Sequence, residues 1–180
     1  MAAGKGTGAG RRADRVSAPL TTARLTLRPR VPDDADALFA AMADADVMRW
    51  WSRAPFATVD ELQAYFSGVQ CAWTVTRTGD DRAIGFVSVM RRREGVCEIG
   101  YLFARETWGC GIAFEAVSAV IADLFAAGER RIFADTDPDN IGSIRLLERL
   151  GFLFEGRLRA EWETHIGVRD TLIYGLLNPC

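Results

Sequence analysis

The sequence predicts a single α/β domain in which helices flank a mixed, mostly antiparallel sheet. Three observations support this fold class. The chain has 180 residues, the usual length of one domain. Three strand-like runs follow one another with only turns between them, which indicates an antiparallel meander. A later alternation of helix, strand and helix indicates a crossover onto the same sheet, and so a three-layer arrangement.

The first expected elements are one strand and two helices. Apolar and polar residues alternate over residues 23–30, which predicts a half-buried strand. Asp33 and Asp34 then precede apolar residues at helical spacing, and acidic side chains are favoured in the first turn of a helix. A second helix is expected after Thr58, because Glu61 three residues later completes a capping box.

Turn signals and periodicity define the rest of the chain. The expected strands cover residues 71–77, 83–90, 96–103, 131–135, 152–162 and 166–177, and the expected helices cover residues 111–127 and 141–150. Gly128 and Gly151 follow the two helices, where glycine commonly ends a helix. The last two strands are expected to close the sheet antiparallel. Arg91, Arg92 and Arg93 are expected at the solvated tip of a hairpin.

Charge and hydropathy argue against two classes of function. The net charge is −2, and the first 17 residues carry four basic residues against one acidic residue, so the rest of the chain is acidic. An acidic body argues against strong nucleic-acid binding, which requires clustered Lys and Arg. Charged side chains interrupt the most apolar stretch, residues 113–127, so no membrane span is expected. We expect residues 1–20 to form a disordered basic leader and residues 21–180 to form the domain.

Cysteine and histidine usage indicates a reduced protein without a metal. The four cysteines lie far apart and lack the CxxC spacing of a metal or redox site. Reduced thiols favour the cytoplasm. The single histidine, His165, shortly precedes Gly167 and is expected in a turn, so no metal site is expected around it.

The most informative motif covers residues 108–113, Trp-Gly-Cys-Gly-Ile-Ala, between a strand and the longest helix. Small residues let backbone N–H groups approach a ligand, and the unpaired amides of a first helical turn favour phosphate oxygens. Pyrophosphate is therefore the expected ligand. No Gly-Lys-Ser/Thr follows, which excludes a Walker loop, and Phe114 interrupts a dinucleotide-binding fingerprint. The alternative is a tight turn that needs glycine for its backbone alone.

With this motif the chain, from Thr22 to Leu177, resembles the GCN5-related N-acetyltransferases (GNAT). Within that family it looks like the RimJ/RimL-type ribosomal-protein N-terminal acetyltransferases. The family's Gln/Arg-x-x-Gly-x-Gly/Ala loop is matched at residues 108–113, and the tryptophan in first place is familiar in this branch. Residues 23–28 and 98–101 also match the branch. The resemblance implies a GNAT fold, acetyl-CoA as cosubstrate, and direct acetyl transfer to a primary amine.

The resemblance also implies where the cofactor binds. From the residues alone, Asn140 and Ser143 indicate only a capped helix. In the family, the asparagine bonds the pantetheine arm and the serine points at the sulfur, where its hydroxyl protonates or orients the departing thiolate. The family also uses backbone amides near residues 102 and 103 to stabilise the oxyanion. The implied cofactor-binding residues are Leu102, Phe103, Trp108, Gly109, Cys110, Gly111, Ile112, Ala113, Asn140 and Ser143. For Cys110 we expect the amide to matter rather than the sulfur.

Two glutamates are candidates for the general base. An ammonium must lose a proton before it attacks a thioester, and a partly buried carboxylate is able to accept that proton. Glu161 lies in an Ala-Glu-Trp segment that resembles the one in which RimL-type enzymes place their proposed base. Glu98, on the strand before the glycine loop, is the second candidate. For both, the alternative is a surface or salt-bridged strand residue.

The acceptor is the part of the function that the sequence defines least. Trp50, Trp51 and Phe56 are candidates for its pocket wall, and a place in the core is the equal alternative. Asp170 and Tyr174 match a family-like Asp-x-x-x-Tyr pattern, which strand packing also explains. A protein N-terminal amine is the expected acceptor, and an aminoglycoside or polyamine is the alternative. A non-catalytic acyl-CoA-binding module and a homodimer are also considered.

Overall fold

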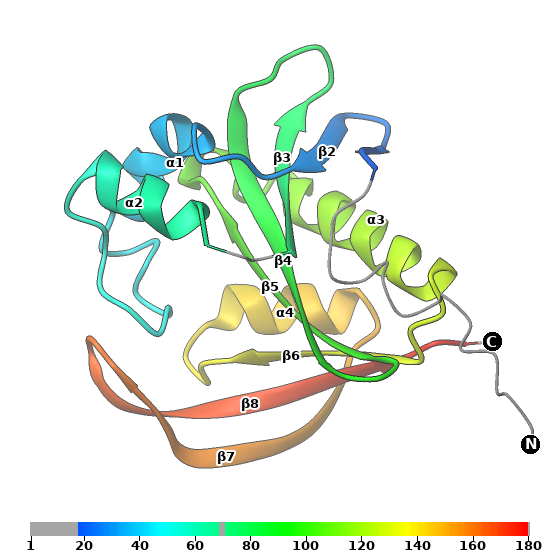
Figure 1. The fold of residues 1–180 in the computed structure, drawn as a ribbon. Coiled ribbons are helices and arrows are strands. Elements are labelled where there is room, and N and C mark those ends of the chain that lie inside the picture. The colour runs from blue at the N-terminus through cyan, green and yellow to red at the C-terminus, as the bar shows by residue number, and fades with distance from the viewer. Residues whose placement is uncertain (1–17, 69–70, 180) are drawn as a thin grey trace, which may run out of the picture.

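The computed structural model describes residues 18–68 and 71–179, which form a mixed sheet flanked by helices (Figure 1). The elements are β1 (Leu20–Thr21), β2 (Leu25–Pro29), α1 (Asp34–Met42), α2 (Val59–Phe66), β3 (Cys71–Arg77), β4 (Ala83–Arg93), β5 (Val96–Phe103), the short 3-10 helix η1 (Arg105–Thr107), α3 (Ile112–Ala126), β6 (Arg131–Thr136), α4 (Ile141–Arg149), β7 (Leu153–Thr164) and β8 (Gly167–Leu177). The eight strands lie in the order β1-β2-β3-β4-β5-β6-β8-β7. Neighbours pair antiparallel except β5 and β6, which pair parallel.

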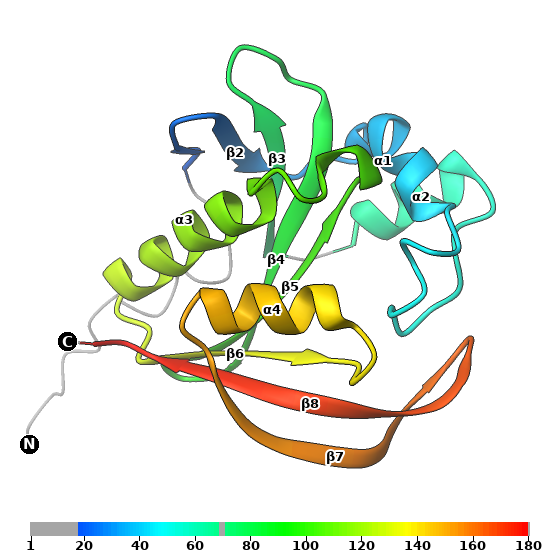
Figure 2. The ribbon, with the colours of Figure 1, turned by 180° about the vertical axis from the view of Figure 1, so that it is seen from behind.

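Helices cover both faces of this sheet. Along β4, Val87 and Val89 face a hydrophobic core shared with α3 and α4, whereas Phe86 faces a second core shared with α1 and α2. Successive side chains of a strand point to opposite faces, so one strand supplies both cores. Figures 1 and 2 show the two pairs of helices on opposite sides of the sheet. The predicted three-layer α/β fold class is confirmed.

The sheet opens between β5 and β6. The two strands pair only from Val96 and Arg131 to Glu98 and Phe133. Beyond these residues β5 stays paired with β4 and β6 stays paired with β8, so the two halves of the sheet diverge (Figure 1). The N-termini of α3 and α4 both follow strands that border this opening. The opening is therefore the place where loops, helix ends and strand residues meet.

Local signals in the sequence locate the helix starts. The Thr58 side chain accepts the N–H of Glu61 at 3.2 Å, which is half of the predicted capping box; the Glu61 carboxylate accepts the N–H of Ala57 at 3.1 Å instead of that of Thr58. The predicted meander of β3, β4 and β5 and the antiparallel closure by β7 and β8 are confirmed. The expected leader, residues 1–20, lies outside the described residues up to residue 17, and β1 begins at Leu20. No helix in the described part of the chain is long and apolar enough to cross a membrane.

The prediction of a solvated arginine tip is wrong for Arg91, which is half-buried, whereas Arg92 and Arg93 are exposed as predicted. β4 continues to Arg93, so the strand is longer than predicted. Arg91 donates to the buried Glu129 at 2.6 Å, and Arg92 donates to the buried Glu98 at 2.5 Å. Each buried carboxylate needs a hydrogen-bonded cation to offset its loss of hydration, and this demand holds the arginines on the sheet.

Candidate active site

The loop before α3 adopts the backbone that the glycine motif predicted. Gly109 and Gly111 have φ angles of 73° and 75°, in the left-handed region that favours glycine. Gly111 is the residue before the first turn of α3, and no side chain caps that turn. The first amides of the helix are thus left for an external acceptor, and the helix dipole favours an anion there.

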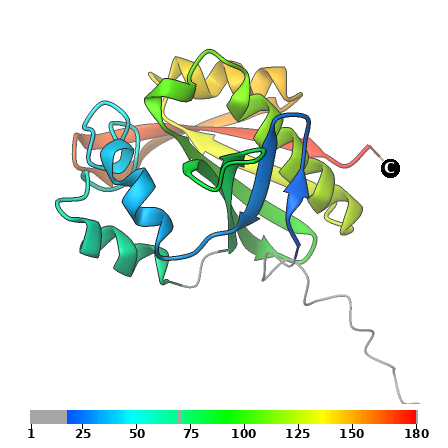
Figure 3. The same cartoon turned by 90° about the horizontal axis from the view of Figure 1, so that it is seen from above.

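A basic side chain, that of Arg24, lies beside this loop. β1 and β2 lie against α3 (Figure 3), and Arg24, just before β2, donates to the backbone oxygen of Cys110 at 3.1 Å. Arg24 also pairs at 2.7 Å with Glu115 in the first turn of α3. A hydrogen bond from Thr22, followed by the bonds from Arg24, lowers the pKa of Glu115. The Glu115 carboxylate is therefore paired with Arg24 and offsets the charge of that guanidinium beside the loop.

A cavity of about 650 Å³ extends from this loop across α3 to the last turn of α4. It is lined by Thr22, Arg24, Cys110, Gly111, Phe114, Glu115, Ser118, Ala119 and Arg149. The Arg149 guanidinium lies 4.4 Å from the centre of the Phe114 ring. Among the described residues Arg149 has no carboxylate partner, so the far end of the cavity carries an unneutralised cation.

The start of α4 brings a half-buried pair of hydroxyl groups to the opening. The Asn140 side chain accepts the Ser143 N–H at 3.2 Å and so caps the helix, and the Ser143 and Tyr101 hydroxyls lie 2.8 Å apart. Burial raises the pKa of Tyr101 to about 12, and the bond with Ser143 opposes this shift only in part. Tyr101 therefore keeps its proton at neutral pH and is able to donate it to Ser143 in a hydrogen bond. Nothing in the sequence assigned a role to Tyr101, because its place on β5 beyond the last pair with β6 is visible only in the fold.

Another hydroxyl at the opening has no partner within the described residues. Thr136, the last residue of β6, is 6% exposed, and its Oγ1 makes no hydrogen bond. The Asn140 amide nitrogen likewise makes no hydrogen bond to described residues. Buried polar atoms normally have partners, so the buried Thr136 Oγ1, together with the half-buried Asn140 amide, fits a ligand that carries hydrogen-bonding groups of its own, as the amide-rich arm of acetyl-CoA does.

The backbone amides of Leu102 and Phe103 on β5 point in opposite directions. The Ala104 N–H donates to Ile84 on β4 at 3.0 Å, and alternate residues of an antiparallel strand point their amides the same way. The Leu102 amide is thereby directed to β4 and the Phe103 amide to the opposite side, toward the opening. The Phe103 backbone oxygen also points away from β4, because it accepts the Trp108 indole N–H at 2.8 Å.

The two candidate bases lie in different surroundings. Glu98 is 8% exposed and is bound by Arg92, so one carboxylate oxygen is engaged. Glu161 is exposed on β7, where the pairing with β8 shifts between Leu158 and Trp162. Trp162, next to Glu161, donates its indole N–H to Asp135 on β6 at 2.8 Å. Glu161 thus lies on a strand segment that is tied to the β6 side of the opening.

Of the three candidate aromatic residues, Trp50 lies outside the second core, and Trp51 and Phe56 pack in it or against it. Trp50 is half-buried, with the Arg49 guanidinium 4.8 Å and the Arg169 guanidinium 5.9 Å from its ring centre. Trp51 packs edge-on against Phe86, and Phe56 is 2% exposed in the second core. Of the three, Trp50 is the one that contacts β8.

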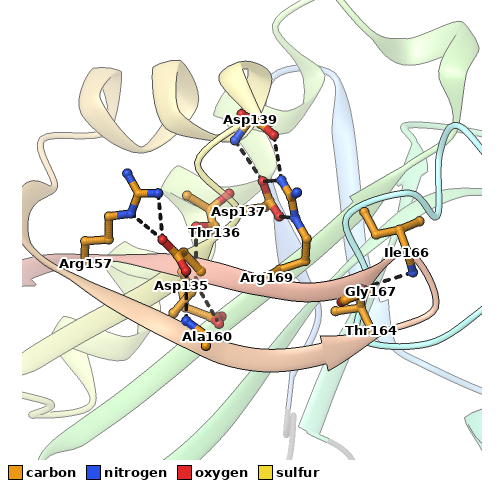
Figure 4. A network of polar contacts seen from close by, with 12 residues as sticks. Asp135, Thr136, Asp137, Asp139, Arg157, Ala160, Thr164, Ile166, Gly167 and Arg169 are labelled. Carbon is orange, nitrogen blue, oxygen red and sulfur yellow. Dashed lines mark hydrogen bonds and ion pairs between the residues drawn. The ribbon is translucent and has the colours of Figure 1, made fainter.

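Arg169 links Trp50 to the loop before α4. Figure 4 shows Arg169 between Asp137 and Asp139, to which it donates at 2.7 and 2.6 Å. Burial alone raises the pKa of Asp137, but the bonds from Arg169 and from the Asp139 amide outweigh it, and the pKa is lowered. The loop before α4 and the β7–β8 hairpin are therefore held together by ionised groups. The described residues contain no group of three or more His, Cys, Asp or Glu able to hold a metal ion.

Comparison with known proteins decides what this arrangement is. Residues 24–153 match the family model of the GNAT acetyltransferase domain. The chain belongs to the GNAT acetyltransferase family. The acetyltransferase is 30% identical over 171 residues to the uncharacterised N-acetyltransferase YoaA of Bacillus subtilis, covering 89% of this chain and 97% of YoaA. It is thus an acyltransferase that uses acetyl-CoA, and the opening lined by α3 and α4 is its candidate active site.

Solved structures share the fold of this acetyltransferase. A probable GNAT-family acetyltransferase from Chromobacterium violaceum matches with a TM-score of 0.84 and 26% identity, covering 99% of this chain and 96% of that one. RimL, a ribosomal L7/L12 alpha-N-protein acetyltransferase in complex with coenzyme A, matches with a TM-score of 0.78 and 17% identity. The match covers 89% of this chain and 98% of the RimL chain. At that identity the likeness to RimL concerns the fold alone.

Proposed function

We propose that this acetyltransferase modifies the N-terminal amine of a protein, as the RimJ/RimL-type enzymes do. The observation that favours a large acceptor is the exposure of the β7 segment beside the opening, which we call the rim. In it Glu161 is exposed and Trp162 is 41% exposed. A carboxylate accepts a proton from an ammonium best where water is excluded. An acceptor that covers the rim excludes that water itself. A polypeptide does so better than a small amine.

In the proposed mechanism the cofactor and the amine meet in the opening between β5 and β6. The free amides of Gly109 to Ala113 bind the pyrophosphate of acetyl-CoA, and Arg149 binds the 3′-phosphate. Asn140 and Thr136 bond the pantetheine arm. The binding residues thus leave the thioester beside the hydroxyl pair of α4 and β5.

The remaining residues act on protons and charge. Glu161 accepts the proton of the amine as its nitrogen attacks the thioester carbonyl, with Glu98 as the alternative base. The Phe103 amide donates to the oxygen on which negative charge develops. Ser143, itself hydrogen-bonded by Tyr101, donates to the departing thiolate. No covalent intermediate forms, and the thiol of Cys110 takes no part.

An acceptor screen tests the proposed substrate class. The purified protein is incubated with acetyl-CoA and a panel of peptides with free N-termini, aminoglycosides and polyamines, and the release of coenzyme A is followed. Turnover on the peptides, with the acetyl group on the α-amine by mass spectrometry, supports the proposal. Turnover confined to small amines identifies the alternative enzyme class, and binding of acetyl-CoA without turnover on any amine identifies a non-catalytic module.

Location in the cytoplasm and a homodimer belong to the proposal as well. Cys97 and Cys110 are thiols outside any disulfide, which supports a reducing compartment. Burial raises the pKa of Cys97 to about 12, so this thiol is unreactive at neutral pH.

Tyr101 and Ser143 are expected to act as a pair. Tyr101→Phe and Ser143→Ala should each lower kcat by about fivefold, because a single hydrogen bond is worth about 1 kcal/mol. The double variant should lose no more than Ser143→Ala alone, since Tyr101 acts only through the Ser143 hydroxyl. Steady-state kinetics at saturating acetyl-CoA measure all three. Losses that multiply in the double variant would show that the two hydroxyls act independently.

Arg149 is expected to bind the 3′-phosphate. Arg149→Ala should weaken acetyl-CoA binding by about 10- to 100-fold, because a hydrogen bond to a charged group is worth about 1.5–3 kcal/mol. Binding of dephospho-coenzyme A, which lacks this phosphate, should be unchanged. Arg149→Lys keeps the cation and serves as the matched control. An equal loss for both ligands in calorimetry would place the contribution of Arg149 elsewhere.

A further inference from the structure

β7 contains an irregular segment directly at the candidate base. Leu158 pairs with Thr171 and Trp162 pairs with Arg169, so three residues of β7 face the single residue Asp170 of β8. The middle one, Ala160, has a φ of 52°. It is the one non-glycine residue with positive φ in the described ranges 18–68 and 71–179. This conformation is unfavourable for a residue with a Cβ, so the surrounding structure must hold it.

Asp170 supplies the group that holds Ala160. The Ala160 N–H donates to Asp170 Oδ1 at 2.8 Å, and Arg157 donates from Nε to Asp170 Oδ2 at 2.7 Å. Figure 4 shows Arg157 and Ala160 among the polar contacts along the hairpin. The hydrogen bond from the Ala160 amide, followed by that from Arg157, lowers the pKa of Asp170. Asp170 is therefore an acceptor with both oxygens engaged at neutral pH.

A second anchor follows on the other side of Glu161. Trp162 donates its indole N–H to Asp135, which also accepts the Thr171 hydroxyl at 3.3 Å. Asp135 lies on β6 beyond its last pair with β5, at the edge of the opening. The backbone on both sides of Glu161 is thus fixed, by Asp170 at Ala160 and by Asp135 at Trp162, although the Glu161 side chain itself is exposed.

We infer that Asp170 is a positioning residue, whose carboxylate fixes the left-handed Ala160 and thereby directs Glu161 to the acceptor amine. The inference rests on the proposed function, which makes Glu161 the base. Asp170 does not touch the reacting atoms. A base displaced by about 1 Å costs about 100-fold in rate, so a fixed backbone at this point has a direct catalytic effect.

A double-mutant cycle between Asp170 and Glu161 tests the inference. Asp170→Ala should lower kcat by about 100-fold on the most active peptide of the acceptor panel, with the KM for acetyl-CoA unchanged. Added to Glu161→Gln, the same substitution should cost less than about threefold, because no base remains to be positioned. Asp170→Asn should restore most of the rate, since its amide oxygen accepts the Ala160 N–H. Glu155→Gln, which breaks the Arg131–Glu155 ion pair on the same strand, is the matched control and should leave kcat unchanged.

The outcomes distinguish the inference from the proposed function. If Glu161→Gln alone keeps the parent rate, the assignment of the base is wrong. If Glu161→Gln loses activity but the effect of Asp170→Ala is the same in both backgrounds, or is absent, Asp170 does not act through Glu161 and the inference is overturned. If Asp170→Ala does not fold, the cycle is measured in the Ala160→Gly background, because glycine adopts positive φ without strain. In that background Asp170→Ala should cost clearly less than 100-fold, and an undiminished cost contradicts the inference.

Discussion

Glu161→Gln is expected to lower kcat by about 100- to 10,000-fold and to leave the affinity for acetyl-CoA unchanged. Glutamine keeps the size of the side chain but cannot accept the proton of the ammonium. The loop that binds the pyrophosphate lies on other elements and is untouched. Glu163→Gln, the same change two residues away on the same exposed strand, is the matched control and should keep the parent rate. Steady-state kinetics and calorimetry on both variants measure the two quantities.

The pH profile provides the sharper form of this prediction. The parent rate should rise with pH through one ionisation, because the base must be deprotonated to accept a proton. Glu161→Gln should remove or shift that limb, whereas Glu163→Gln should keep it. If Glu161→Gln retains the parent profile and Glu98→Gln loses it, the base is Glu98.

Gly111→Asp is expected to abolish acetyl-CoA binding. The substitution places a carboxylate at the start of α3, where the free amides and the helix dipole favour a phosphate, and the two anions repel. Part of any effect comes from the backbone, because a side chain at φ 75° costs on the order of 1 kcal/mol. Gly128→Asp separates the two causes. Gly128 has a φ of 94° at the other end of the same helix and has no neighbour within 4 Å of an added Cβ.

Calorimetry on the two glycine variants decides between strain and charge. Both should unfold at a lower temperature than the parent, because both place a side chain in the left-handed region. The loss should be larger for Gly128→Asp, because its carboxylate lies at the negative end of the helix dipole. Only Gly111→Asp should lose the binding heat of acetyl-CoA. Parent-like binding by Gly111→Asp would move the cofactor site away from this loop.

Local chemistry explains why most elements were predictable from the sequence. The capping pair Thr58 and Glu61 and the helix-ending Gly128 and Gly151 are signals contained within a few residues. The strand order was less accessible. β8 lies between β6 and β7, so the last strand in the chain is not the last in the sheet. That order depends on pairings between distant segments, which no local pattern encodes.

The candidate site divides in the same way. The glycine loop was readable because positive φ and exposed amides need small residues in a short stretch. The Tyr101–Ser143 pair joins residues 42 positions apart, so their contact follows from the fold alone. The left-handed Ala160 has no mark in the sequence, since alanine rarely adopts this conformation. Its partner Asp170 was visible only as part of a family-like pattern.

A crystal structure of the protein with coenzyme A is the most direct test of whether the cofactor enters the opening between β5 and β6. We expect the pyrophosphate to accept hydrogen bonds from the amides at the start of α3, with Gly111 at the centre of that contact. We also expect the sulfur to lie beside the Ser143 hydroxyl. Coenzyme A bound on another surface, with these amides and Ser143 uncontacted, would show that the cofactor does not enter this opening.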